Sequence, residues 1–210
     1  MFRLYFISDS ALTPTEPPAQ PLVEAARAGV EMVQIREKSL AALELLSITR
    51  EVVAAAGAGG TQIYVNGRFD IARAAGATGI HLPEGGIPAG DARRAGGAGL
   101  KIGCSTHSLS QAAAAEEAGA DFIVFGPVYE TPSKKRFGPP VGLAALEMVL
   151  TSVRIPVYAI GGIGPDNIGQ VAALPVAGAA VISAIALARD RAAAVSRLRD
   201  AARRARGEDS

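Results

Sequence analysis

Short apolar runs alternate with longer segments of helical character along the whole chain. The runs are of strand length and continuously apolar, which is typical of strands in a parallel sheet covered on both faces. Between two of them, residues 40–56 carry Leu45, Ile48 and Val52 at the i, i+3 and i+7 spacing of an amphipathic helix. The pattern predicts strands over residues 4–7, 30–35, 62–65, 79–82, 100–103, 121–125, 156–160 and 178–182.

A predicted helix follows each predicted strand. Gly29 ends the first helix, and the Ser108 hydroxyl is placed to cap the fifth. Eight such units without a break in composition predict an α/β fold, a (β/α)8 or TIM barrel, with residues 1–210 as one domain. An open doubly wound sheet is the alternative, and the eight units favour closure. The helices are predicted over residues 21–28, 40–56, 69–75, 89–95, 109–118, 143–150, a segment after Pro165, and 190–206.

Composition narrows the class of protein further. A chain of 210 residues that is 49% hydrophobic can bury one sizeable core. The formal net charge of +1 gives no argument for nucleic acid or an anionic membrane as a partner, and the basic segment 197–206 is interpreted as the solvated face of the last helix. The single cysteine, Cys104, excludes an intramolecular disulfide and fits a cytoplasmic location. The apolar start of the chain is too short for a signal peptide or a membrane span.

Polar residues follow several predicted strands, where a (β/α)8 barrel carries its chemistry. At the end of the second strand, alternation places Gln34, Arg36 and Lys38 on one side. Two cations and an amide that converge there suit an oligophosphate. A solvated strand end with a surface pair between Glu37 and Lys38 is an equally good interpretation of these residues alone.

The next three strand ends carry weaker signals. Asn66 is followed by glycine, which is typical of a turn. His81 lies near a strand end, where a lone histidine is more often a hydrogen-bonded structural residue than a catalyst. Ser105 and its neighbouring hydroxyls precede a helix N-terminus, which suits either capping or an anion. Cys104 has no base beside it in the sequence, so we expect a small buried hydrophobe rather than a nucleophile.

The last three strand ends point to a phosphorylated ligand. The long loop over residues 126–140 offers hydroxyls and lysines that suit a charged ligand, although they equally suit a solvated tip. Gly161 and Gly162 follow the seventh strand, and Ser183 follows the eighth. In (β/α)8 enzymes these two loops frequently bind phosphate through backbone N–H groups and a short helix N-terminus. The sequence therefore predicts a phosphate site there.

These segments together resemble the thiamine phosphate synthase/TenI family over essentially the whole chain. The resemblance rests on the order and spacing of residues 33–38, 65–68, 79–83, 102–108, 125–134 and 159–163. Synthase members join a pyrimidine methyl diphosphate to a thiazole phosphate and release diphosphate. The resemblance implies that Gln34, Arg36, Lys38 and Asn66 hold the diphosphate side, that Ser105 and Lys134 lie between the substrates, that Thr131 and Ser133 contact the thiazole phosphate region, and that Gly162, Ile182 and Ser183 lie at its phosphate.

The chain departs from the synthase pattern at the positions that hold Mg²⁺. Synthases typically carry Asp after the Asn of the third strand and again shortly after the His-Leu of the fourth. Here Gly67 stands at the first position, Gly85 and Gly86 lie around the second, and Glu84 is the nearby carboxylate. Mg²⁺ prefers oxygen ligands, which glycine side chains cannot supply. We therefore expect no metal and no cofactor, with Mg²⁺ required only if the chain is a synthase.

Three functions remain open, and the lost carboxylates favour the first. It is a TenI-like thiazole tautomerase, which aromatises a thiazole carboxylate phosphate by moving a proton. The histidine that some TenI proteins use is Pro127 here, so His107, Lys134 and His81 are the candidates for proton transfer. The second function is a thiamine phosphate synthase, and the third is a non-catalytic binder of thiazole phosphate or thiamine phosphate. The expected partner is a small phosphorylated thiazole, and a homodimer is possible although the sequence does not determine an oligomeric state.

Overall fold

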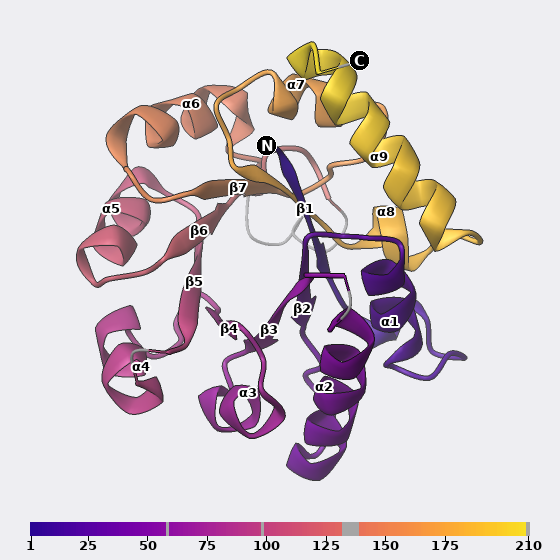
Figure 1. Ribbon diagram of the computed structural model, residues 1–210. Coiled ribbons are helices and arrows are strands. Elements are labelled where there is room, and N and C mark those ends of the chain that lie inside the picture. Colours follow the sequence, from indigo (N-terminus) through magenta and orange to yellow (C-terminus); the bar gives the residue numbers. More distant parts are fainter. Residues whose placement is uncertain (58, 98, 132–138, 209–210) are drawn as a thin grey trace.

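A computed structural model describes residues 1–57, 59–97, 99–131 and 139–208. Within these residues, eight parallel strands pair in chain order, and the eighth pairs with the first to close a barrel (Figure 1). The predicted (β/α)8 barrel is confirmed, and the open sheet is excluded. The strands are β1 (Arg3–Ile7), β2 (Met32–Ile35), β3 (Gln62–Asn66), β4 (Gly79–Leu82), β5 (Lys101–Thr106), β6 (Phe122–Phe125), β7 (Val157–Ile160) and β8 (Gly178–Val181).

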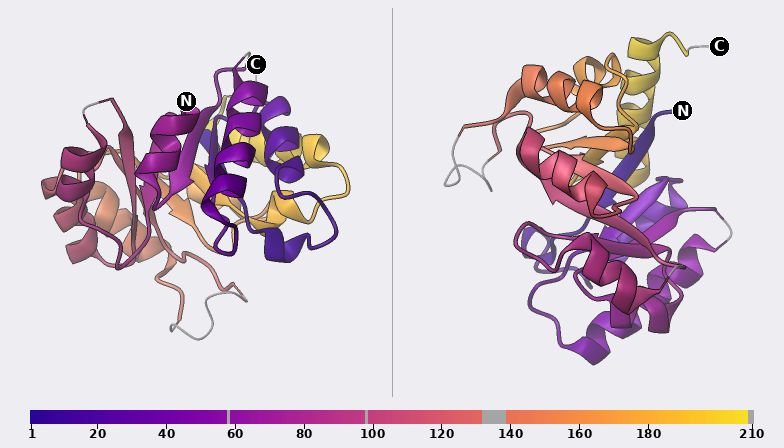
Figure 2. Two further views of the ribbon diagram at one scale, coloured as in Figure 1. Left: turned by 90° about the horizontal axis from the view of Figure 1, so that it is seen from below. Right: turned by 90° about the vertical axis from the view of Figure 1, so that its left-hand side faces the viewer.

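Helices surround the barrel on its outer side, as the views in Figures 1 and 2 show. Their positions follow the predicted order, and the Ser108 side chain caps its helix by accepting from the Gln111 amide. Two short elements were not predicted: the 3-10 helix η1 (Ser10–Leu12) and the helix α8 (Ser183–Ala186) directly after β8. The other helices are α1 (Gln20–Arg27), α2 (Ala42–Ala56), α3 (Phe69–Ala75), α4 (Ala89–Gly96), α5 (Leu109–Glu117), α6 (Gly142–Ser152), α7 (Ile168–Ala172) and α9 (Arg191–Arg206).

Aromatic side chains fill the interior of the barrel. Tyr5, Tyr64, Phe122 and Tyr158 meet edge to face, with ring centroids 5.1 to 6.0 Å apart. Gly103 makes room for this cluster, because a Cβ there would lie 2.1 Å from the Phe122 ring. The barrel is therefore packed through its centre, and ligands can enter only at its ends.

The outer faces of the strands pack against the helices in a second apolar layer. Leu4, Phe6, Val33 and Ile35 belong to this layer, and so does Cys104. Burial raises the pKa of the Cys104 thiol to about 11, so the thiol stays protonated at neutral pH. The expectation that Cys104 is a small buried hydrophobe is confirmed.

None of the helices in the described ranges combines the length and the apolar character that a membrane span requires.

Candidate active site

Two glycines shape the end of β7 at the mouth, the opening formed by the C-terminal ends of the strands. Gly161 and Gly162 have φ angles of +103° and +63°, which side-chain-bearing residues rarely adopt. A Cβ on Gly162 would lie 2.4 Å from the carbonyl oxygen of Glu130, so the loop after β6 approaches too closely for any side chain. Asn167 fixes this turn by donating to the Gly162 carbonyl and accepting from the Gly164 amide, both at 2.8 Å. The turn thus presents backbone rather than side chains to the mouth.

Helix α8 begins at the adjacent strand end. Ile182 precedes its first residue, and Ser183 is exposed at that first position. The first N–H groups of a helix have no partner within the helix, and its dipole favours an anion there. Gly161, Gly162 and α8 are called the glycine half of the mouth below. These groups are compatible with the phosphate site that the sequence predicts, which stays a prediction.

Cationic side chains lie at the end of β2. Arg36 is partly buried, and its Nη1 lies 3.5 Å from the Asp9 carboxylate, whereas Lys38 is exposed in the loop. Arg36 and Lys38 are called the cationic half below. Gln34 lies deeper, with 1% of its surface exposed, and its Nε2 donates to the Tyr5 hydroxyl at 3.0 Å. The structure therefore places Gln34 below the two cations, inside the barrel.

Glu37 holds the cationic half from behind. Its carboxylate accepts from the Ser8 hydroxyl at 2.5 Å and from the Ser10 amide at 3.2 Å. The Ser8 Oγ in turn accepts from the Arg36 amide at 2.9 Å. Only 9% of Glu37 is exposed, so the interpretation of this residue as part of a surface pair with Lys38 is wrong. Its burial follows from these bonds to the loop after β1, a partner that alternation along β2 alone cannot reveal.

The floor of the mouth contains a histidine–serine pair. His81 Nε2 lies 2.9 Å from the Ser105 Oγ, and His81 is 2% exposed against the Tyr5 and Phe122 rings. Burial, and secondarily the charge of Arg36, lowers the pKa of His81 to about 3. The ring is therefore neutral at pH 7, which suits orienting Ser105 better than donating a proton as a cation. Asn66 is half-buried at the end of β3, two strands from Ser105 in the barrel order.

His107 directly follows β5 and lies among polar groups. Its Nδ1 bonds to the Gly126 carbonyl, which can only accept, so Nδ1 carries the proton. Nε2 then faces the Glu84 carboxylate at 3.4 Å, and Gln111 donates to the other Glu84 oxygen at 3.0 Å. His107 is partly exposed and remains a candidate for proton transfer.

The same contacts bear on Mg²⁺, which the resemblance implies for synthases. Gly67 and Gly85 both have positive φ angles, and no atom lies within 4 Å of a Cβ built at either position. Because glycine has no side chain, neither position supplies an oxygen ligand. Glu84 is engaged by His107 and Gln111. Within the described ranges, no group of three or more His, Cys, Asp or Glu residues could hold a metal. These residues do not fit the Mg²⁺ site of the synthase pattern.

The loop after β6 contributes Thr131, which is half-buried and has a partner. Ser133 and Lys134, expected at the thiazole phosphate and between the substrates, lie outside the described residues.

Comparison with known proteins identifies the family. The family described as thiamine monophosphate synthase (TMP-TENI) matches residues 4–185. The chain belongs to this family. A putative thiamine-phosphate synthase of Geobacter sulfurreducens is 45% identical over 184 residues, which are 88% of this chain and 86% of that protein. The thiamine-phosphate synthase of Moorella thermoacetica is 38% identical over 98% of both chains.

A solved member of similar size supports the same placement. The thiamine phosphate pyrophosphorylase from Pyrococcus furiosus superposes with a TM-score of 0.88 at 33% identity, over 97% of this chain and 96% of that chain. The relatives cited here carry the name of the synthase activity rather than that of TenI. The membership expected from the motifs is confirmed, whereas the narrower assignment to the TenI branch is not supported by these names.

Sequence reasoning missed two buried residues that support the mouth. Tyr5 binds Gln34, and Ser8 links Glu37 to the Arg36 amide. The run of strand β1 into a Ser-Asp-Ser segment was the available signal for Ser8, because chemistry follows every strand in this fold. Tyr5 carried no such signal, since an aromatic residue within a strand usually indicates core.

Proposed function

We propose that this chain is a thiamine phosphate synthase, which joins a pyrimidine methyl diphosphate to a thiazole phosphate and releases diphosphate. The observation that carries the proposal is that one mouth offers two separate sets of groups suited to anions. The cationic half follows β2 and the glycine half follows β7 and β8, with β1 alone between β2 and β8 in the barrel. An enzyme with one phosphorylated substrate needs only one of them. The names of the full-length relatives support the same choice.

The cationic half has the chemistry to assist departure of diphosphate. When the bond between the pyrimidine methylene carbon and the diphosphate oxygen breaks, its electron pair leaves with the oxygen. Positive groups held where that charge develops stabilise the transition state more than the ground state. Arg36 has its backbone fixed by Ser8 and its guanidinium steered by Asp9, so it is held in place before the reaction begins.

The glycine half is suited to bind the second substrate, the thiazole phosphate. Backbone N–H groups of the Gly161–Gly162 turn and of the start of α8, with the Ser183 hydroxyl, suit a phosphate monoester. Ser105 lies on β5, two strands from β7 in the barrel order, and is held by His81. Two bound phosphorylated substrates are thereby oriented toward each other without a covalent enzyme intermediate.

A thiazole tautomerase is the second candidate, and a specific observation favours it. The carboxylates of the synthase pattern are replaced by Gly67, Gly85 and Gly86, while Glu84 is bound to His107 and Gln111. A tautomerase needs the glycine half and a proton-transfer group, for which His107 is placed at the mouth. It does not need the cationic half.

One set of assays separates the candidates. Purified protein is incubated with both synthase substrates, with and without Mg²⁺, and thiamine phosphate and diphosphate are quantified. A parallel reaction contains the thiazole carboxylate phosphate alone. We expect equimolar thiamine phosphate and diphosphate, and we expect Arg36→Gln to reduce this turnover at least tenfold. Isomerisation that is untouched by Arg36→Gln, with no diphosphate formed, identifies the tautomerase instead. Binding without turnover in either assay identifies a non-catalytic binder.

A further inference from the structure

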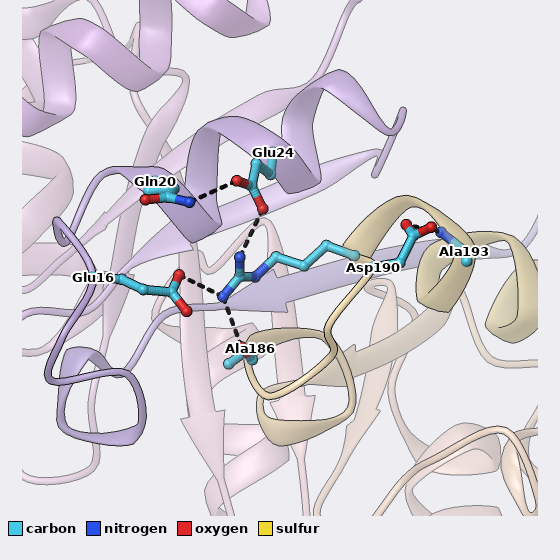
Figure 3. A network of polar contacts seen from close by, with 7 residues as sticks. Glu16, Gln20, Glu24, Ala186, Asp190 and Ala193 are labelled. Carbon is cyan, nitrogen blue, oxygen red and sulfur yellow. Dashed lines mark hydrogen bonds and ion pairs between the residues drawn. The ribbon is translucent and has the colours of Figure 1, made fainter.

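Arg191 lies at the start of α9, in a partly buried network of polar contacts outside the mouth (Figure 3). Its Nη1 donates to Glu24 at 2.6 Å, and its Nη2 donates to Glu16 at 2.7 Å. The same Nη2 donates to the Ala186 carbonyl at 2.9 Å. One guanidinium thus joins the loop after β1, helix α1 and the last residue of α8.

The burial of this arginine is costly. Only 6% of Arg191 is exposed, and its Nε has no hydrogen-bond partner among the described residues. Removing a guanidinium from water costs desolvation free energy, which is offset only when its partners are well placed. An exposed ion pair between helices avoids most of this cost. The network therefore indicates that the relative position of its three elements matters.

Helix α8 is too short to be stable without support from outside itself. It has four residues, so it makes about one turn and is roughly 6 Å long. Isolated helices of this length are unstable because nucleation is unfavourable. Arg191 binds the carbonyl at its C-terminal end, where a cation also complements the helix dipole. A shift at Ala186 is passed through a single turn to Ser183 at the other end.

We propose that Arg191 is a positioning residue that sets α8 for the phosphate of the thiazole substrate. The inference rests on the proposed function, because it takes the start of α8 as the site of that phosphate. Glu16 and Glu24 hold the guanidinium, and the guanidinium holds α8. The loop that carries Glu16 also carries Ser8 and Ser10, which bind Glu37 behind the cationic half. Loosening Arg191 therefore acts on the glycine half, while the bonds to Glu37 keep the cationic half in place.

The test compares two arginines of the same helix. Arg199 also lies on α9, where its Nη2 donates to the Gly29 carbonyl at 2.7 Å and pairs with Glu31 at 3.2 Å. Those partners precede β2, at the end of the barrel opposite the mouth. The variants are Arg191→Gln, Arg191→Lys and Arg199→Gln. Each is assayed for KM of both substrates, for kcat and for thermal unfolding.

We expect Arg191→Gln to raise KM for the thiazole phosphate at least tenfold, with kcat and KM for the pyrimidine diphosphate within twofold of wild type. Arg191→Lys keeps the positive charge on a single donor nitrogen and restores part of the affinity. Arg199→Gln lowers Tm without moving either KM. Equal changes in both KM values for Arg191→Gln, or a fall in Tm alone, would overturn the proposal. If Arg191→Gln does not fold, Glu16→Gln replaces it with the same expected split, since it weakens the hold on Nη2 alone.

Calorimetric titration with thiazole phosphate, and separately with inorganic phosphate, distinguishes failure of this inference from failure of the proposed function. Wild-type protein that binds thiazole phosphate but forms no thiamine phosphate contradicts the synthase, while a weaker Kd in Arg191→Gln alone still supports the positioning role. Equal Kd values in wild type and Arg191→Gln contradict the positioning role whatever the turnover. Absence of thiazole phosphate binding in wild type contradicts both.

Discussion

The two halves of the mouth offer different groups to an anion. The cationic half offers two long charged side chains, Arg36 and Lys38. Ser8 accepts from the Arg36 amide and donates to the buried carboxylate of Glu37, and Asp9 pairs with the Arg36 guanidinium. The glycine half uses main-chain N–H groups, which become available because Gly161 and Gly162 carry no side chains. The first half tolerates small backbone shifts because its side chains can adjust. In the second half, on our proposal, the backbone itself binds the phosphate, so its position has to be maintained by contacts from outside, for which Asn167 and Arg191 are placed.

We expect the largest effect on stability and activity from one methyl group added to the glycine half. Gly162→Ala places a Cβ 2.4 Å from the Glu130 carbonyl oxygen at φ +63°. We expect a loss of about 3 kcal/mol or more in stability from overlap and backbone strain, and at least a hundredfold loss in kcat/KM for the thiazole phosphate. Urea unfolding and steady-state kinetics measure the two effects.

Gly164→Ala is the matched control, since it lies in the same turn with no atom within 4 Å of a Cβ. It should leave both quantities nearly unchanged. Wild-type affinity in Gly162→Ala, or equal damage from both variants, would show that close backbone approach does not define this half.

Acid should lower the stability of the fold through His81, on the floor of the mouth. The pKa of His81 is about 3 in the folded protein, against an ordinary value of 6.5, because of burial and then Arg36. Between those values the unfolded chain binds more protons, so stability falls as the pH drops below 6.5, by at most about 1.4 kcal/mol per pH unit. From pH 7 to pH 5, wild type should lose about 2 kcal/mol more than His81→Gln in urea unfolding.

Arg36→Gln tests which cause dominates, because it removes the smaller of the two. The acid-induced loss between pH 7 and pH 5 should stay nearly the same in that variant, because burial alone keeps the His81 ring neutral at pH 5. Parallel stability curves for wild type and His81→Gln would contradict a buried neutral imidazole.

Glu37→Gln should weaken the cationic half alone. The amide keeps an acceptor for Ser8 but can turn N–H groups toward the Ser10 amide, leaving a buried donor poorly satisfied. We expect KM for the pyrimidine diphosphate to rise about tenfold, which corresponds to about 1.4 kcal/mol, with KM for the thiazole phosphate unchanged. Glu44→Gln, an exposed carboxylate on α2, serves as the control. A rise in the thiazole phosphate KM alone would mean that Glu37 serves the other half.

The two halves also differ in how far the sequence predicts them. Arg36 and Lys38 stand out because charged residues at a strand end need a reason, and Gly161 and Gly162 stand out by their place after β7. The barrel follows from periodicity, since eight apolar runs and eight helical segments have few ways to bury both faces. Glu37 and Arg191 were not predicted as supports. The hydrogen-bond partners of Glu37 lie 27 to 29 residues away, and the carboxylate partners of Arg191 lie 167 to 175 residues away. Side-chain contacts over such separations depend on the closed barrel, and local pattern does not specify them.

The smallest expected effect on stability comes from restoring a carboxylate beside the cationic half. Gly67→Asp sits at φ +67°, which Asp tolerates better than most residues, and its Cβ meets nothing within 4 Å. We expect a cost of about 1 kcal/mol, far less than for Gly162→Ala although both glycines have nearly the same φ. The variant also supplies one oxygen ligand that the synthase pattern has and this chain lacks. If the chain is a synthase that uses its cationic side chains in place of Mg²⁺, added Mg²⁺ should stimulate Gly67→Asp more than wild type in the diphosphate-release assay. An identical response of the two proteins to Mg²⁺ would mean that Gly67 does not mark the position of the missing ligand, and that the departure from the synthase pattern lies elsewhere in the mouth.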